Sequence, residues 1–209
     1  MLNKLKKAAL VGSGLLVLAG CSSESADDAS VNSEAVGAET LVVGLDDTFA
    51  PMGFRDENNE IVGFDVDLAK AVGERIGAEI VFQPIDWAMK ETELDSGNID
   101  MIWNGYAITP ERAEKVLLSE PYIVDAQSII VLKDSAIETK ADLEGKLVST
   151  QQSSSSVDKI MEDESGIFGK LGGDLVLYLS NNNGFSDLES GRVDAIVVGE
   201  VYGRYYMME

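Results

Sequence analysis

The chain has 209 residues, a formal net charge of −21 and 45% hydrophobic residues, so it can bury a core. The acidic excess makes it a poor nucleic-acid binder, because phosphate contacts need clustered Lys and Arg. Histidine is absent and cysteine occurs once. This excludes an intrachain disulfide, Cys-based metal sites and the Ser-His-Asp or Cys-His arrangements of hydrolases, and we expect no metal and no cofactor.

The first 20 residues have the layout of an export signal. Three lysines precede an apolar run over residues 8–19, which is too short to span a hydrocarbon core of about 30 Å. Leu18-Ala19-Gly20-Cys21 resembles a bacterial lipobox, whose cysteine is acylated. We therefore expect a signal peptide over 1–20 and lipidation at Cys21, anchoring the protein on the extracytoplasmic face of the cell membrane. The alternative is a structural cysteine in an N-terminal helix.

A flexible acidic tether is predicted for residues 21–40, because Ser, Ala, Asp and Glu dominate there and no aromatic residue offers surface to bury. A surface helix docked on the folded part is the alternative. The folded part is expected to start with a strand over 41–45, followed by a loop over 46–54. Apolar residues spaced three and four apart predict a helix over 64–76, ended by Gly77.

A strand over 79–83 and a helix over 87–94 follow, and strands that alternate with helices indicate an α/β sheet. The segment Leu94–Ile102 then recurs as Leu188–Ile196, each copy ending a helix at a glycine and starting a strand. We predict two α/β lobes of related construction that face a shared cleft, over residues 41–128 and 129–209. Chance recurrence of a common helix-glycine-strand transition is the alternative.

Two polar segments are candidates for ligand binding. Asn104–Arg112 follows a predicted strand over 99–103, and open α/β sheets bind ligands at the carboxyl ends of their strands. Thr109 suits the N-cap of a helix that begins at Pro110. Arg112 offers a planar fork for a carboxylate, although a surface ion pair is the alternative.

The second segment, residues 151–156, holds four serines after a predicted strand over 147–150 and before a helix, which they can cap or where they can bind an anion. Phe49 and Trp87 are candidates for apolar walls of a small-molecule site, although aromatic residues lie more often in a core. Asp46 and Asp47 can hold an ammonium group or cap a turn.

At this point the chain resembles a known family. Gly63–Ile76 is similar to the signature of bacterial extracellular solute-binding proteins of family 3, the polar amino-acid receptors of ABC importers. Asp46–Pro51, Ser96–Asp100 and Ile108–Arg112 match the same pattern in the same order. The resemblance implies a type II periplasmic-binding-protein-like fold, in which a monomer captures a polar amino acid between two lobes and delivers it to an ABC permease.

The resemblance also implies roles for single residues. Arg112 would grip the ligand α-carboxylate, while Asp65 and Asp67 of the signature are expected on a surface helix outside the pocket. The backbone at Gly105 and Ala107 would assist, together with Asn104, and Ser154 and Ser155 would close over the carboxylate. Phe49 and Trp87 would flank the ligand side chain. Asp46 and Gln151 would face the end of that side chain.

Three departures from the family pattern stand out. Ala107 replaces a Ser or Thr, and Gly199 replaces the aspartate that binds the ligand ammonium group. Glu200 is the candidate to replace that aspartate. The chain also ends about 50 residues earlier than family members, so we expect a fragment whose second lobe and return segment are incomplete.

Two other functions remain as alternatives to the receptor. The first is an enzyme on the same fold, dehydratase-like or cleaving cell wall, which would need Asp or Glu as its acid and base because histidine is absent. The second is a sensor or adhesin lipoprotein that has lost transport, which Ala107 and Gly199 favour. We favour the receptor and expect no enzymatic activity.

Overall fold

The computed structural model describes residues 39–208. The predicted export signal, Cys21 and most of the predicted tether lie outside the described residues. The tether prediction is wrong for Glu39 and Thr40, which are the first two residues of strand β1 (Glu39–Leu45). They pair with Ala78 and Glu79 of the neighbouring strand, so ladder hydrogen bonds order them although their side chains are polar and exposed.

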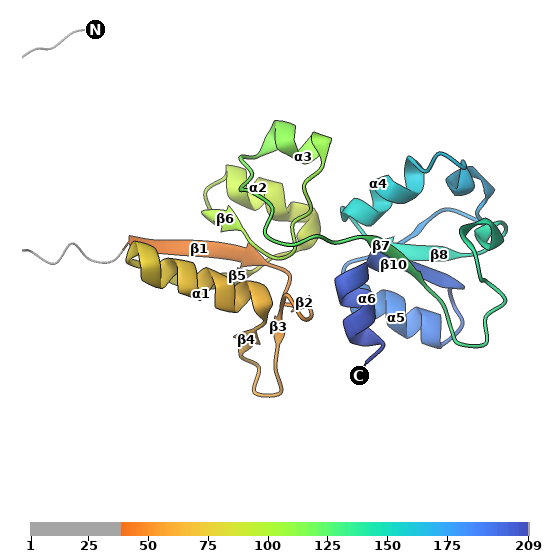
Figure 1. Ribbon diagram of the computed structural model, residues 1–209, viewed down its shortest axis with the longest axis horizontal. Helices are drawn as coiled ribbons and strands as arrows, with labels where there is room; N and C mark the ends of the chain where they lie inside the picture. The colour runs from red at the N-terminus through yellow and green to blue at the C-terminus, as the bar shows by residue number, and fades with distance from the viewer. Residues whose placement is uncertain (1–38, 209) are drawn as a thin grey trace, which may run out of the picture. The chain divides into compact units, whose positions relative to one another are not determined.

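A three-stranded parallel sheet forms the first part of the fold. Its spatial order is β5 (Ala78–Pro84), β1 and β6 (Met101–Ile102), which confirms the strands predicted over 41–45 and 79–83. Helix α1 (Phe64–Ile76) lies along one side of β1, and α2 (Lys90–Asp95) and α3 (Pro110–Lys115) lie on the opposite side (Figure 1). The helix predicted over 87–94 begins as a 3-10 turn, η1 (Trp87–Met89), and continues as α2.

The predicted bounds of α1 are confirmed, and Gly77 ends the helix in the left-handed conformation with φ 74°. The apolar residues whose spacing predicts the helix, among them Phe64 and Ile76, do not form its buried face. Phe64 and Ile76 are 48% and 61% exposed, whereas the buried positions are Asp65, Val66, Ala69 and Gly73. The buried stripe is therefore rotated by about one residue, because Gly73 allows the helix to approach β5 closely.

The segment over 46–54, predicted as a loop, contains two short strands. β2 (Thr48–Phe49), β3 (Gly53–Arg55) and β4 (Ile61–Val62) form a small antiparallel sheet. Pro51 lies in the turn between β2 and β3, where its missing N–H breaks no ladder bond.

A four-stranded sheet forms the second part of the fold. Its order is β7 (Gln127–Ile130), β10 (Ala195–Gly199), β8 (Val148–Gln151) and β9 (Val176–Tyr178), with β7 antiparallel to β10. Helix α4 (Ser155–Met161) lies on one face, and α5 (Asn181–Glu189) and α6 (Glu200–Tyr206) lie on the other (Figure 1). Two further 3-10 turns, η2 (Lys140–Leu143) and η3 (Ile167–Lys170), precede and follow α4.

Strand β10 divides the core of this second part. Its residues are all buried and alternate between two clusters, since successive side chains of a strand point to opposite faces. Ile196 and Val198 pack with residues of α5 and α6, whereas Ala195 and Val197 pack on the side of α4. This burial on both faces explains the continuous apolar run of the strand.

The recurrence of Leu94–Ile102 as Leu188–Ile196 is a repeat in structure as well. The glycine of each copy has φ 72°. In the first copy Asp100 Oδ2 accepts the Val42 N–H at 2.7 Å, and in the second Asp194 Oδ2 accepts the Leu147 N–H at 2.8 Å. Each copy thus ends a helix and aligns a strand beside its parallel neighbour in the same way, which argues against chance.

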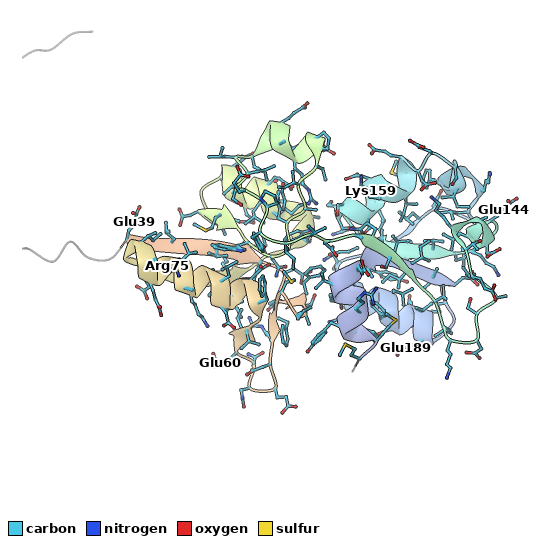
Figure 2. The ribbon with its side chains drawn as sticks, in the orientation of Figure 1. Glu39, Glu60, Arg75, Glu144, Lys159 and Glu189 are labelled. Atoms are coloured by element: carbon cyan, nitrogen blue, oxygen red, sulfur yellow. The ribbon has the colours of Figure 1, made fainter. Side chains whose placement is uncertain are left out.

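The excess charge lies on the outside of the fold. Figure 2 shows labelled side chains that project away from the sheets, all of them exposed: Glu39, Glu60, Arg75, Glu144, Lys159 and Glu189. None of the helices between residues 39 and 208 combines the length and hydrophobicity that a membrane span requires.

Candidate functional site

A cavity of about 800 Å³ lies where the loops that follow the strands of both larger sheets meet. This volume is typical of a small-molecule site. Every predicted site residue except Glu200 lines it: Asp46, Phe49, Trp87, Asn104, Gly105, Ala107, Arg112, Gln151, Ser154 and Ser155.

Arg112 is a buried cation on the wall of this cavity. The α3 start predicted for it is confirmed, since Thr109 Oγ1 accepts the Arg112 N–H at 3.2 Å and Pro110 follows the cap. Its guanidinium donates from Nη1 to the Ala107 carbonyl at 3.0 Å and from Nη2 to the Ser153 carbonyl at 3.2 Å. It also lies 4.3 Å from the centre of the Tyr106 ring. These contacts hold the planar fork in one orientation.

Lys90 is a second buried cation, which the sequence interpretation missed. Its Nζ donates to the Ser153 carbonyl at 3.1 Å, lies 3.1 Å from Glu91 Oε2 and sits over the Trp87 ring. Burial lowers the pKa of Lys90, and the adjacent Glu91 carboxylate opposes that shift. Arg112 and Lys90, both from the first part of the fold, therefore donate to the same Ser153 carbonyl of the second part. No local signal separates Lys90 from the exposed lysines of other helices.

Asp65 corrects the expectation that the signature carboxylates lie on a surface helix. Asp67 is exposed, but Asp65 is only 1% exposed. Its Oδ2 accepts the Gly105 N–H at 2.7 Å, and its Oδ1 accepts the Tyr122 hydroxyl at 2.8 Å. Burial raises the pKa of Asp65 although both hydrogen bonds lower it. Asp65 thus fixes the backbone at Gly105, where φ is +59°.

Asp46 and Gln151 form a buried polar pair across the cavity. Gln151 Nε2 donates to Asp46 Oδ2 at 2.6 Å, while Asp46 Oδ1 accepts both the N–H and the hydroxyl of Thr48. Burial raises the pKa of Asp46, against the effect of these donors. Asn104 Oδ1 accepts the Asp46 N–H at 3.2 Å, and its buried Nδ2 has no partner within residues 39–208. This Nδ2 packs against Gly53, where an added Cβ would lie 2.5 Å from it.

The serines at the start of α4 make fewer capping contacts than expected. Ser154 occupies the N-cap position without a side-chain cap bond, since its Oγ donates back to the Gln151 carbonyl at 2.7 Å. Ser155, the first residue of the helix, also lines the cavity. Ser153 adopts φ 53°, a left-handed conformation that presents its carbonyl to the two cations of the first half.

Phe49 and Trp87, the two aromatic residues predicted as walls, both line the cavity. Phe49 stacks on Tyr202 of α6 with ring centres 5.0 Å apart, and Trp87 packs edge-on against Tyr106 at 6.1 Å. Each ring is therefore held by another ring while it lines the cavity.

The placement of Glu200 at the site is wrong. Its carboxylate accepts a hydrogen bond from Arg204 Nε at 2.6 Å, one turn further along α6, and it does not line the cavity. A glutamate in the first turn of a helix is favoured at that surface position by the helix dipole and by an i, i+4 pair. Asp125, which the sequence interpretation did not consider, lines the cavity beside Gly199 instead.

Comparison with known proteins identifies the family. The family model of bacterial extracellular solute-binding proteins, family 3, matches residues 41–171. The chain belongs to this family. Among relatives of this solute-binding protein, the L-cystine-binding protein TcyJ of Escherichia coli (strain K12) is 30% identical over 94% of this chain and 73% of its own length. The arginine-binding extracellular protein ArtP of Bacillus subtilis (strain 168) is 32% identical over 81% of this chain and 65% of its own.

Solved structures establish the fold of this solute-binding protein. A histidine-bound substrate-binding protein of an ABC uptake transporter from Streptococcus pneumoniae matches with a TM-score of 0.79 and 38% identity, over 81% of this chain and 69% of its own. An ancestral arginine-binding protein with bound arginine matches with a TM-score of 0.76 and 36% identity, over 82% and 75%. The predicted type II periplasmic-binding-protein-like α/β fold is confirmed. These four relatives are binding proteins rather than enzymes.

Proposed function

We propose that this chain is the substrate-binding component of an ABC importer, and that it captures a polar amino acid in the cavity between two lobes, residues 41–128 and 129–209. Arg112 carries the proposal. A buried guanidinium on the wall of a cavity of about 800 Å³ is a site for an anionic group of a small ligand.

The ligand carboxylate is proposed to bind Arg112. Among the described residues, two carbonyl oxygens engage two of the five guanidinium N–H donors, which leaves donors for a carboxylate. The backbone at Ala107 and the hydroxyls of Ser154 and Ser155 complete this end of the site, and Gly105, whose N–H is engaged by Asp65, leaves room for the ligand beside them. Asp65 supports it indirectly, because it holds Gly105 in place.

The ligand side chain is proposed to lie between Phe49 and Trp87 and to reach toward Asp46 and Gln151. Asn104 supports this end, since its Oδ1 accepts the Asp46 N–H at 3.2 Å. A carboxylate at this end disfavours an acidic side chain. A neutral or cationic polar amino acid is therefore the expected ligand, and relatives whose names specify arginine, histidine and cystine as ligands support this range.

We propose that the chain delivers its ligand to a membrane permease, which its membership of the family supports. We propose that acylation of Cys21 anchors a monomer on the extracytoplasmic face of the cell membrane, beside its ABC permease. The basic start, the short apolar run and Leu18–Cys21 support the anchor. Labelling with a radioactive fatty acid, in the wild type and in Cys21→Ser, tests it, and equal labelling of both proteins would contradict it.

Isothermal titration calorimetry of the purified chain against the common amino acids and cystine tests the main proposal. We expect one or a few polar amino acids to bind, and Arg112→Gln to weaken that binding at least about 30-fold, because truncating a buried charge pair costs about 2–5 kcal/mol. Arg75→Gln, which removes an exposed arginine of α1, is the matched control and should leave binding unchanged. Absence of heat with every amino acid would refute the proposal.

A further inference from the structure

The end of strand β10 holds an unexpected carboxylate. Gly199 ends the strand and lines the cavity without a side chain. A Cβ added to Gly199 would lie 2.5 Å from Asp125 Oδ2 and 3.4 Å from Asp125 Cγ. The Asp125 carboxylate thus occupies the space that a side chain at position 199 would fill, and a larger residue there would displace this carboxylate.

Backbone contacts hold Asp125 in this position. Its Oδ1 accepts the Val201 N–H at 3.1 Å, and the carbonyl of the next residue, Ala126, accepts the Glu200 N–H at 2.7 Å. Gly199 also pairs with Gln127 in the β7–β10 ladder. The carboxylate is therefore tied to the junction of β10 and α6 from both sides, while it still lines the cavity.

Segment 153–156, at the start of α4, contacts Arg112 at one end and Gln127 of β7 at the other. At one end of the segment, the Ser153 carbonyl accepts the hydrogen bond from Arg112 Nη2. At the other end, Ser156 Oγ donates to Gln127 Oε1 at 2.5 Å, and Gln127 is the ladder partner of Gly199. Arg112 and the ladder partner of Gly199 thus contact opposite ends of the segment 153–156, three of whose serines line the same cavity as Asp125.

The other carboxylates near this end of the cavity are already engaged. Asp46 accepts hydrogen bonds on both oxygens from Thr48 and Gln151. Glu200 pairs with Arg204 and lies outside the cavity lining. Asp125 is the carboxylate that borders Gly199. The residue is exposed, and partial desolvation raises its pKa although backbone N–H groups lower it.

We infer that Asp125 binds the α-ammonium group of the ligand, in the place of a side chain at position 199. The inference rests on the proposed function, because an α-amino acid held at Arg112 by its carboxylate carries an ammonium group on the adjacent carbon. Gly199 is then part of the binding site rather than a sign that binding has been lost.

The variant Asp125→Asn tests the charge alone, since its side-chain oxygen can still accept the Val201 N–H and its volume is unchanged. Calorimetry compares wild type and variant with two probes: the amino acid that binds the wild type most tightly, and the same molecule without its α-amino group. We expect the variant to weaken the amino acid about 30-fold and to leave the deaminated probe unchanged or bound more tightly. Glu200→Gln is the matched control and should change neither affinity.

A second test moves the carboxylate from position 125 to position 199 and so does not depend on a single variant. Gly199→Asp alone should bind poorly, because its side chain collides with Asp125. Gly199→Asp combined with Asp125→Ala should recover at least about tenfold of the affinity that Asp125→Ala loses. Thermal unfolding of each variant shows whether it is folded. If Asp125 only capped α6, its substitution would change the melting temperature but not the preference for the amino acid over the deaminated probe.

The outcomes separate this inference from the proposed function. If the wild type binds an amino acid and Asp125→Asn binds it equally well, the inference is wrong and the proposed function stands. If Asp125→Asn weakens the amino acid and the deaminated probe by the same factor, Asp125 has only a structural role and the inference is also wrong. If no amino acid binds the wild type, the proposed function fails and the inference fails with it.

Discussion

The carboxylate of Asp65 accepts the backbone N–H of Gly105 at 2.7 Å, although the two residues are 40 positions apart in the chain. Helix α1 thereby acts on the cavity without lining it. Its second residue holds the loop that carries Gly105 and Ala107, while Tyr122 donates to the other oxygen of the same carboxylate. This arrangement gives the signature helix a positioning role.

We predict that Asp65→Asn destabilises the protein by about 1–3 kcal/mol. Both oxygens of Asp65 accept hydrogen bonds, and an amide turns one acceptor into a donor facing Gly105 or Tyr122, which leaves a buried group unsatisfied. Urea unfolding measures the change. The control is Asp67→Asn on the exposed side of the same turn, expected within about 0.5 kcal/mol of the wild type. Equal effects of the two variants would contradict the positioning role.

The stability that depends on Asp65 should increase as the pH falls. Burial raises the pKa of this carboxyl, so the folded protein binds its proton more tightly than the unfolded chain. Stability is therefore gained as the pH falls through the folded-state pKa, and lost as it rises. We expect the free energy of unfolding of the wild type, relative to Asp65→Asn, to grow between pH 7 and pH 4. A difference that shrinks over this range would show that the pKa of Asp65 is lowered instead.

Removal of the buried cation at position 90 should loosen the contact between the two halves. Lys90 donates to the Ser153 carbonyl and pairs with Glu91, and the loss of a hydrogen bond from a charged group costs about 1.5–3 kcal/mol. We expect Lys90→Gln to lose that amount of stability in urea unfolding and to weaken ligand binding. Lys159→Gln, which replaces an exposed lysine of α4, should change neither. Comparable results for the two variants would show that the contact with Ser153 contributes nothing.

The close approach of α1 to β5 should depend on Gly73. A Cβ there would lie 2.5 Å from Ile80 Cγ1 and 2.9 Å from the Ala78 carbonyl oxygen. Overpacking of this kind costs about 1–3 kcal/mol, so Gly73→Ala should lower the melting temperature. Gly169→Ala is the matched control, because no atom lies within 4 Å of its Cβ position, and it should be neutral or slightly stabilising. A melting temperature of Gly73→Ala equal to that of the control would show that α1 can shift without loss.

Local signals predict much of this fold correctly. The bounds of α1, the glycine that ends it, the Thr109 cap and the repeat at 94–102 and 188–196 all depend on residues within one turn or one strand of each other. The motif around Arg112 likewise leads to a residue that lines the cavity. These features are encoded by neighbours in the chain, where spacing and residue type are sufficient.

The amino-acid sequence by itself determines the α/β class, the family and the segments that line the cavity. Only the tertiary structure decides which face of α1 is buried, that Asp65 and Lys90 lie inside, and that Asp125 rather than Glu200 stands beside Gly199. The physical reason is that helical periodicity is almost the same for two adjacent faces. The choice between them, and the partner of each buried charge, depends on contacts between residues 40 to 76 positions apart.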